Sequence, residues 1–420
     1  MAACTSKRTL LIVSGGREAV PAIEEAHRMG LRVVVSDGAP DAPGFRLADA
    51  GLLASTYDAE ATVEAARVYA SRSRIDGVLA VAADVPVTVA AVADALGLPG
   101  LSLGTAELAA DKLAMKARLR EEGVSVPWYA AVPSAEALED VMLRTSGPLI
   151  VKPVDSRGAR GVVRLLPDVE PAWAYHQAEV ESPTGRVMVE AFVEGPQVST
   201  ESVVTGGHTF TVGVSDRNYD LLDRFAPYVI ENGGELPSCV TAATRTAIEQ
   251  QVAAAAAALG IRHGTVKGDI VVAPEGPCVI ELAARLSGGY FCTHEIPLAT
   301  GVNFVGAAIR LALGEEPGAE ELAPRWSRGV AQRYLFPEPG TVVAVEGAAE
   351  AAAGEGIALL EVAVVPGRCV PSMTSHVCRA GMVIAVGESR EEAVARAEDA
   401  AARVRIVTRR EAAPVSATAH

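Results

Sequence analysis

The sequence predicts a multidomain protein of the α/β and α+β classes, and three observations support this. The chain has 420 residues, which is too many for one hydrophobic core and indicates several domains. Residues 7 to about 100 alternate apolar strand patterns with helix patterns, which is typical of a parallel sheet covered by helices. From Pro148 to Val214, runs rich in valine, isoleucine and threonine indicate that strands dominate.

The expected elements follow from these patterns. In the first hundred residues they are strands Thr9–Val13, Arg32–Ser36 and Gly77–Ala82 and helices Ala19–Met29, Thr62–Arg72 and Val85–Leu96. Further along we expect one charged helix over Ala106–Glu122, a hairpin of Ser199–Thr205 and Thr209–Val214, and helices Ala242–Leu259, Thr300–Leu313 and Glu391–Val404. Residues 411–420 are expected to be disordered.

Composition excludes several classes of function. The net charge of −15 argues against a general nucleic-acid or membrane-surface binder, which would carry basic patches. No apolar run reaches the length of a membrane span. The six cysteines lack metal-site spacing and are expected to be reduced thiols, so the chain is expected to be cytoplasmic.

Two acids twelve positions apart, Asp269 and Glu281, form the most informative pattern. They lie in two apolar runs around a Pro/Gly turn, which predicts a β-hairpin. With Ala273–Pro277 as the loop, Val272 pairs with Cys278 and Asp269 lies opposite Glu281. Opposed carboxylates repel each other, and a divalent cation such as Mg²⁺ between them would remove that cost.

The same register assigns neighbouring residues to the two faces of the hairpin. The face of the acids also carries Lys267 opposite Ala283, and Arg285 opposite Thr265, and the fixed charge of Arg285 suits a phosphate or carboxylate. The other face is expected to be core and carries Ile270, Val272, Ile280 and Leu282. On these residues alone, a solvated outer face stays an alternative.

Basic and glycine-rich residues suggest a phosphate site. Lys152 ends an apolar strand and is followed by a loop in which Gly158 and Gly161 permit backbone N–H groups to point at phosphate oxygens, with Arg157 and Arg160 adding charge. An ordinary surface hairpin is the alternative. Lys112 opens a helix, where a cation is unfavourable unless an anion lies near it. Two further acids, Glu190 and Glu201, lie within apolar strands.

Taken in order, these motifs resemble the ATP-grasp superfamily. The pattern runs from ADKLAMK (Ala110–Lys116) through LIVKP and the glycine loop to VEAFVEGPQVSTESV (Val189–Val203) and GDIVV…VIELAAR, over roughly residues 7–315. The resemblance implies a parallel-sheet pre-ATP-grasp domain (1–105), an ATP-grasp fold whose two α+β subdomains (106–185 and 186–318) clasp ATP, and a small α+β C-terminal domain (319–410).

The resemblance also implies roles for single residues. ATP contacts are expected from Lys112, Lys152, the loop residues Ser156, Arg157, Gly158 and Gly161, the acids Glu190 and Glu201, and the backbone of Ala191, Phe192 and Val193. Asp269 and Glu281 match the magnesium-bridging acids, with Mn²⁺ as a possible substitute. The catalytic residues are expected to be Arg285, Lys152 and Lys267. Substrate residues are expected at Arg285, Ser287, Gly288, Gly289, His263 and Glu231.

One departure from the family pattern concerns Ala283, where many members carry an asparagine that binds magnesium. This leaves open whether one or two ions bind. The tail Arg379–Thr408 and the segment Ala226–Ser238 resemble ATP-grasp L-amino-acid ligases. The implied reaction joins a small carboxylate and an amine to an amide through an acyl phosphate, and the family suggests a homodimer. Alternatives are a bicarbonate-activating carboxylase or carbamoyl-phosphate-type enzyme, a purine-pathway ligase, and an ATP-binding regulatory pseudoenzyme.

Overall fold

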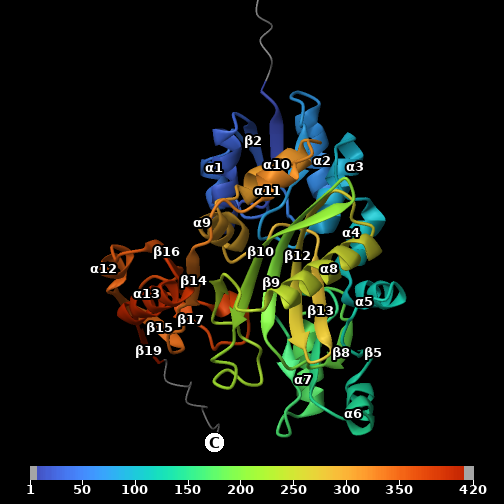
Figure 1. The fold of residues 1–420 in the computed structure, drawn as a ribbon, viewed down its shortest axis with the longest axis vertical. Coiled ribbons are helices and arrows are strands. Elements are labelled where there is room, and N and C mark those ends of the chain that lie inside the picture. The colour runs from blue at the N-terminus through green and yellow to red at the C-terminus, as the bar shows by residue number, and fades with distance from the viewer. Residues whose placement is uncertain (1–6, 411–420) are drawn as a thin grey trace, which may run out of the picture. The chain divides into compact units, whose positions relative to one another are not determined.

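The structure, a computed structural model, describes residues 7–410 (Figure 1). These residues form two compact units, each built from separate stretches of the chain. The first unit contains the described residues up to 128 together with 193–216 and 238–327, and the second contains 129–192, 217–237 and the described residues from 328. The expected disorder of 411–420 lies outside the described residues, and the division of the chain into domains at residues 105, 185 and 318 stays a prediction.

The first unit begins with a four-stranded parallel sheet. Its strand order is β3-β2-β1-β4, with bounds β1 (Thr9–Val13), β2 (Arg32–Asp37), β3 (Ala50–Leu53) and β4 (Gly77–Leu79). Its helices are α1 (Val20–Arg28), α2 (Ala59–Ala70) and α3 (Pro86–Leu96). All five residues of β1 are buried, which confirms the predicted alternation around a parallel sheet. The short strand β3, whose residues are only half-buried or exposed, was not predicted.

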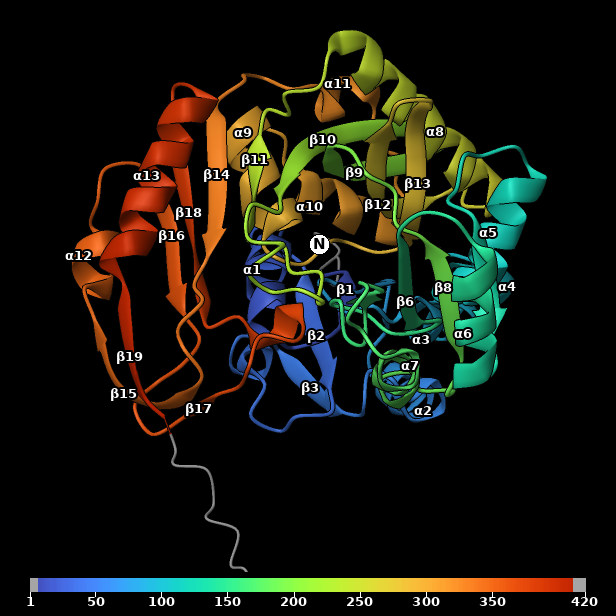
Figure 2. The same ribbon diagram turned by 90° about the horizontal axis from the view of Figure 1, so that it is seen from below.

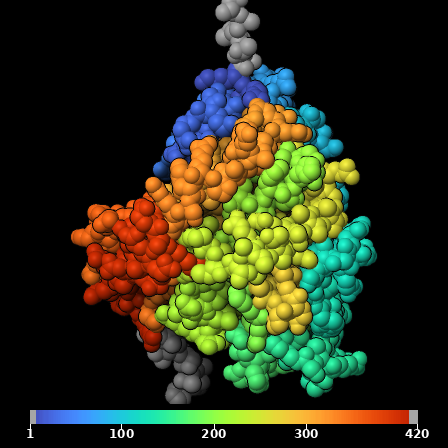
Figure 3. All heavy atoms as spheres, viewed as in Figure 1, coloured from blue at the N-terminus to red at the C-terminus, as the bar shows by residue number. Residues whose placement is uncertain are grey.

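A second, antiparallel sheet of this unit carries the predicted hairpin. Its strands are ordered β13 (Gly276–Ala283), β12 (Gly264–Ala273), β9 (Gln197–Thr205) and β10 (His208–Asn218). The long helix α8 (Ala242–Ala258) lies along β12 and β13 and buries Ile248 and Val252 against them (Figure 1). Helix α10 (Phe304–Ala312) packs on α1 and β4, and its orange atoms lie against the blue N-terminal residues in Figure 3. The short helices α9 (Ile296–Thr300) and α11 (Ala319–Leu322) flank α10.

Two helix predictions were wrong in their boundaries. The single helix expected over 106–122 is divided into α4 (Leu103–Ala110) and α5 (Lys112–Glu121), because extended Asp111 caps α5 by accepting from Ala114 N at 2.8 Å. The helix expected from Thr300 begins only at Phe304. Gly301, with φ of 76°, ends α9, and the side chain of Asn303 caps α10.

The second unit contains a mixed α/β portion with Lys152 at its centre. Its sheet has the order β5 (Tyr129–Val132), β8 (Val187–Ala191), β6 (Leu149–Pro153) and β7 (Val163–Arg164), with all neighbours antiparallel. Helices α6 (Ala135–Arg144) and α7 (Pro171–Val180) contact each other and cover this sheet (Figure 2). All five residues of β6, Lys152 among them, are buried.

The remainder of the second unit is the C-terminal α+β portion. Strands β11 (Gly233–Leu236), β14 (Gly329–Tyr334), β18 (Gly381–Gly387) and β16 (Ile357–Val362) are antiparallel neighbours in this order. Helix α13 (Arg390–Arg403) packs on β14 and β18, and the short α12 (Ala348–Ala352) lies beside β16 (Figure 2). A three-stranded sheet has the order β17 (Cys369–Val370), β15 (Gly340–Glu346) and β19 (Arg405–Arg409). Among residues 7–410, no helix is long and apolar enough to cross a membrane.

Candidate active site

The hairpin β12–β13 places Asp269 directly opposite Glu281, as predicted, but by a different route. Ala273 pairs with Gly276 around a two-residue turn, so Val271, and not Val272, lies opposite Cys278. A β-bulge at Ile280 then shifts the register by one residue and restores the pairing of the two acids. The bulge also corrects the predicted core face, because Val279 is fully buried in the core while Ile280 is not.

A lysine that sequence reasoning missed supports the bulge. Lys116 is only 1% exposed, and its Nζ donates to the backbone carbonyl of Ile280 at 2.8 Å. It lies one helical turn after Lys112 on α5, so the signal was an i, i+4 lysine pair within ADKLAMK. Lys116 thereby links α5 to the strand that carries Glu281.

Each hairpin acid has an ammonium neighbour. The Nζ of Lys112 lies 3.2 Å from Glu281 Oε1, and Lys267 forms an ion pair with Asp269 on the same strand. Ser199 Oγ donates to Asp269 Oδ1 at 3.3 Å. The unfavourable position of Lys112 at a helix N-terminus is thus offset by an anion of the protein itself, Glu281.

The donor set of this cluster fits magnesium bound together with phosphates. Among the described residues, no three His, Cys, Asp or Glu side chains cluster as a complete metal cage. Asp269 and Glu281 lie on one sheet face, with side chains 18% and 26% exposed. Two such carboxylates fit Mg²⁺ because that ion commonly takes one or two protein carboxylates and fills its shell with water and phosphate oxygens. Asp269 and Glu281 are therefore the residues of this unit that could hold a metal.

Arg285 lies just beyond the hairpin. The ladder ends at the pair Lys267–Ala283, so Arg285 does not lie opposite Thr265 as predicted. Its Nη1 donates to the carbonyl of Leu286 at 3.2 Å, and its Nε lies 3.8 Å from Asp84 Oδ1. Burial opposes the charge of Arg285, but the surrounding carboxylates, Asp84 first, raise the pKa of the guanidinium. Asp84 was missed, although an acid shortly after a parallel strand is a recognisable signal.

Glu201 is fully buried beside this arginine. Its Oε1 accepts from Ser287 N at 3.1 Å, and its Oε2 has no hydrogen-bond partner among the described residues. Burial raises the pKa of Glu201 to about 7, although Ser287, Arg285 and Lys267 lower it in part. Burial, with Glu201 adding to it, also raises the pKa of the Cys292 thiol, which donates to Ser287 O at 3.1 Å. Glu201 thus fixes the start of the loop that follows Arg285.

The next residues of this loop contact the N-terminal sheet. Gly289 N donates to the carboxylate of Glu18, and a Cβ on Gly288 would lie only 2.9 Å from the same carboxylate. Glu18 was not predicted as a site residue. A side chain at 288 would therefore push the Glu18 carboxylate away from Gly289 N.

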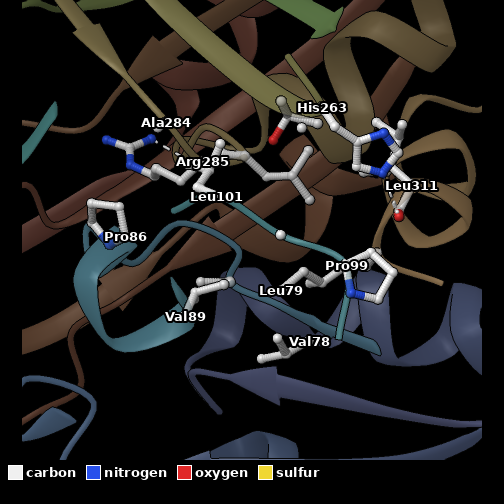
Figure 4. A pocket seen from close by; sticks show the side chains of 17 residues that line it. Val78, Leu79, Pro86, Val89, Pro99, Leu101, His263, Ala284, Arg285 and Leu311 are labelled. Carbon is white, nitrogen blue, oxygen red and sulfur yellow. Dashed lines mark hydrogen bonds between the residues drawn. The ribbon is translucent and has the colours of Figure 1, made fainter. Parts of the chain in front are cut away.

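A small apolar cavity adjoins Arg285. It has a volume of about 80 Å³, and Figure 4 shows Arg285 and His263 on opposite sides of it, with Leu101 between them and Val89 and Val78 below. The Nε2 of His263 lies 2.8 Å from the carbonyl oxygen of Leu311. His263 is thereby held in place by α10 at the far side of the cavity.

In the second unit, Lys152 and Glu190 form a buried ion pair. Their side chains are 6% and 4% exposed and come from the adjacent strands β6 and β8. A lone buried charge is costly, and each group supplies the opposite charge that the other needs in this apolar sheet. The structure therefore brings together two residues that were both expected to contact ATP.

The glycine loop after Lys152 has an unusual backbone. Gly158, Ala159 and Gly161 all have positive φ, at 65°, 57° and 66°. A Cβ on Gly161 would lie 2.7 Å from the carbonyl oxygen of Gln177, so only glycine fits there. The base of the loop is fixed by Asp155, whose carboxylate accepts from Ser182 and Thr184 at 2.6 Å each.

Of the remaining predicted residues, Ala191, Phe192 and Glu231 fall in the second unit and Val193 falls in the first. Phe192 N donates to Pro148 O at 2.9 Å, and the chain passes from the second unit to the first between Phe192 and Val193. Glu231 pairs with Arg217 and lies 3.9 Å from Arg379, so it belongs to a charged cluster of the C-terminal portion. Glu231 lies in the second unit and Arg285 in the first, so its expected role at the substrate stays a prediction.

Curated relatives match part of the chain. The protein y4rH of Sinorhizobium fredii is 28% identical over 325 residues, which are 76% of this chain and 65% of that protein. The formate-dependent phosphoribosylglycinamide formyltransferase of Burkholderia lata is 31% identical over 198 residues, 45% of this chain and 47% of that enzyme. The chain thus spans about half to two thirds of the length of these relatives.

Solved structures match nearly the whole chain. An L-amino acid ligase from Bacillus licheniformis superposes with a TM-score of 0.81 at 24% identity, covering 96% of this chain and 99% of that one. A phosphoribosylglycinamide synthetase from Anaerococcus prevotii gives 0.74 at 16% identity, covering 96% and 100%. At these identities the likeness shows that the fold is shared.

Family models match three successive parts of the chain. An ATP-grasp N-terminal domain matches residues 23–100, an ATP-grasp domain matches residues 109–289, and the L-amino acid ligase C-terminal domain 2 matches residues 333–409. The ATP-grasp match contains Lys112, Lys152, Glu190, Asp269 and Glu281, the residues that carried the sequence argument. The chain belongs to the ATP-grasp superfamily of ligases and ends in a C-terminal domain of the L-amino acid ligase type.

Proposed function

We propose that this protein is an ATP-dependent carboxylate–amine ligase that joins small amino-acid-like substrates. The observation that carries the proposal is the cluster of Asp269, Glu281, Lys112 and Lys267 next to Arg285, in a chain that ends in an L-amino acid ligase C-terminal domain. The cluster supplies groups for the phosphate end of ATP. Arg285 is a planar donor suited to a carboxylate or acyl phosphate.

In the proposed reaction, the carboxylate substrate attacks the γ-phosphorus of ATP, the bond to the β-phosphate oxygen breaks, and ADP leaves. The amine then attacks the acyl carbon, loses a proton, and expels inorganic phosphate to give the amide. A Mg²⁺ ion held by Asp269 and Glu281 would neutralise phosphate charge. Lys112, Lys152 and the backbone N–H groups of the glycine loop would neutralise the rest and hold the reacting groups in line.

Arg285 and its neighbours have a separate task in this proposal. Arg285 orients the substrate carboxylate, while Asp84 and Glu201 hold the guanidinium from nearby. Ser287, Gly288 and Gly289, fixed by Glu201 and Glu18, form a backbone surface along which substrate would lie. The protein contributes positioning and charge, with no covalent intermediate on the chain.

The test is a phosphate-release screen of the purified chain over pairs of amino acids, with ATP and Mg²⁺ or Mn²⁺. Single amino acids, bicarbonate alone and formate alone serve as controls. We expect release only when a carboxylate and an amine are both present, together with mass-spectrometric detection of the dipeptide. Full release with bicarbonate alone would overturn the proposal, and nucleotide binding without any substrate-dependent ADP release would favour a regulatory pseudoenzyme.

A purine-type ligase is the second candidate. It is favoured by the 198-residue match to a formate-dependent phosphoribosylglycinamide formyltransferase. Adding formate together with phosphoribosylglycinamide to the screen separates the two, because a purine-type ligase requires turnover with that pair and none with amino-acid pairs. The expected homodimer is tested on the same preparation by light scattering.

A further inference from the structure

A short turn of the C-terminal portion lies on the glycine loop. This turn, His376–Cys378, connects the region after β17 to β18. The backbone N–H of His376 donates to the carbonyl oxygen of Gly158 at 3.0 Å. The side chain of Val377 lies beside the same residue, with its Cγ1 3.7 Å from where a Cβ on Gly158 would stand. The contact therefore falls within the segment expected to bind phosphate.

The ring of His376 anchors this turn to a third segment. Its Nε2 accepts from the backbone N–H of Glu231 at 3.3 Å. The guanidinium of Arg379, just after the turn, donates to Glu231 O and lies over the ring of Tyr334 at 3.6 Å. Ser375, before the turn, is buried. The turn is thus held on both sides and presents a fixed N–H to the loop.

The glycine loop needs such an external contact. Ala159 has a φ of 57°, which an alanine adopts only at a cost, and the glycines at 158 and 161 allow the loop backbone many alternative conformations. A hydrogen bond to Gly158 O removes much of that freedom before any ligand binds. Pre-ordering a loop increases its affinity for a ligand, because less entropy is lost on binding.

We propose that the turn His376–Cys378 holds the glycine loop in its phosphate-binding conformation, with His376 as the positioning residue. The inference rests on the proposed function only in naming ATP as the ligand of the loop. It assigns the C-terminal portion a part in nucleotide binding, and it links the loop to Glu231 through one histidine.

The test uses full-length variants at His376 and cleavage of the loop by trypsin, which cuts after Arg157 and Arg160. His376→Pro removes the N–H donor and the ring, and proline suits this position because Ser375 is extended and His376 begins the turn. His376→Ala removes the ring alone. His176→Ala is the matched control, since His176 is an exposed histidine on α7 of the same unit.

Without nucleotide, we expect His376→Pro to be cleaved at Arg157 and Arg160 about fivefold faster than wild type, the effect of one lost hydrogen bond, and His376→Ala less so. Each variant should bind a non-hydrolysable ATP analogue more weakly, by about the factor by which its loop is cleaved faster. Cleavage elsewhere and the unfolding temperature should be unchanged. In turnover assays the KM for ATP should rise while the KM for the carboxylate stays the same. The control should match wild type throughout.

Cleavage at wild-type rates in both folded variants would overturn the inference, whatever their ligase activity. If no substrate pair gives turnover, the cleavage and nucleotide-affinity comparisons still decide, so failure of the ligase assignment is distinguishable. If His376→Pro does not fold, amide exchange of the wild-type chain is decisive. A slowly exchanging His376 N–H, with faster loop cleavage in His376→Ala, supports the inference, and unprotected exchange at His376 contradicts it.

Discussion

Lys267 and Asp269 form an ion pair between side chains two residues apart on β12. On the opposite strand, Glu281 lies 3.2 Å from the Nζ of Lys112. Both acids that could hold a metal are thus already neutralised by lysines of the same unit. A metal ion entering the hairpin has to share or displace these ammonium groups, so the lysines set the metal affinity of the nucleotide-free chain.

The first prediction concerns Lys267→Gln. Removing the ammonium leaves Asp269 without its competitor for cations, so the nucleotide-free variant should bind Mn²⁺ about tenfold more tightly, the effect of one partly buried charge pair. The loss of free Mn²⁺ signal in electron paramagnetic resonance measures this affinity. Lys267→Arg keeps the charge and serves as the control. Equal or weaker binding by Lys267→Gln would show that Lys267 does not act on the metal.

The second prediction compares Glu281, at the expected metal site, with Glu275, which lies in the turn of the same hairpin. Glu281→Gln should lower substrate-dependent ADP release by about a hundredfold or more, because charge stabilisation of the reacting phosphates is lost. Glu275→Gln is the matched control, since Glu275 lies exposed in the turn of the same hairpin. Release of ADP is measured under saturating Mg²⁺. Full ATP turnover by Glu281→Gln would contradict the proposed metal role.

The acid pair was predictable from sequence, but its local geometry was not. Alternation along two apolar runs fixes which residues share a face, and this correctly paired Asp269 with Glu281. The tighter turn at Ala273–Gly276 and the bulge at Ile280 each shift the register by one residue and cancel each other. This bulge receives a hydrogen bond from Lys116 on α5, which is distant in the sequence. No local pattern in the strand predicts that contact.

Contacts between distant segments account for the other differences. The pairing of Lys152 with Glu190 follows from the sheet order β8-β6, which joins residues 38 positions apart. The support of Gly289 by Glu18 and of Arg285 by Asp84 likewise depends on how the N-terminal sheet meets the hairpin sheet. The break between α4 and α5 was within reach of sequence reasoning, because Asp111 is a good N-cap residue that can accept from the backbone N–H of Ala114, three positions later.

The third prediction concerns the pH dependence of stability. The folded-state pKa of Glu201 is raised to about 7 from 4.5, so between these values the folded chain holds a proton that the unfolded chain has released. Stability from this group therefore falls as pH rises through that window, by up to about 3 kcal/mol. Glu201→Gln cannot titrate and keeps the acceptor for Ser287 N. Its unfolding temperature should exceed that of wild type by several degrees at pH 8, with little difference at pH 5.

Calorimetry of both proteins at a series of pH values measures this difference. Every other titrating group is common to the two proteins. Only Glu201 therefore contributes to a change with pH in the difference between their unfolding temperatures. Glu275→Gln again serves as a control, because an exposed carboxylate should give curves parallel to those of wild type. Parallel curves for Glu201→Gln would mean that the buried carboxylate does not titrate in this range.

The fourth prediction separates structural from functional roles in the buried pair Lys152–Glu190. Lys152→Met leaves a carboxylate buried without its cation, which should destabilise the second unit by about 3 kcal/mol and lower the unfolding temperature. Adding Glu190→Gln removes the uncompensated charge, so the double variant should recover most of that stability. Nucleotide affinity should stay low in both, because the double variant still lacks the ammonium expected at the phosphates. Titration with a non-hydrolysable ATP analogue measures the nucleotide affinity, and thermal unfolding measures the stability. Wild-type nucleotide affinity in the double variant would show that Lys152 has only a structural role.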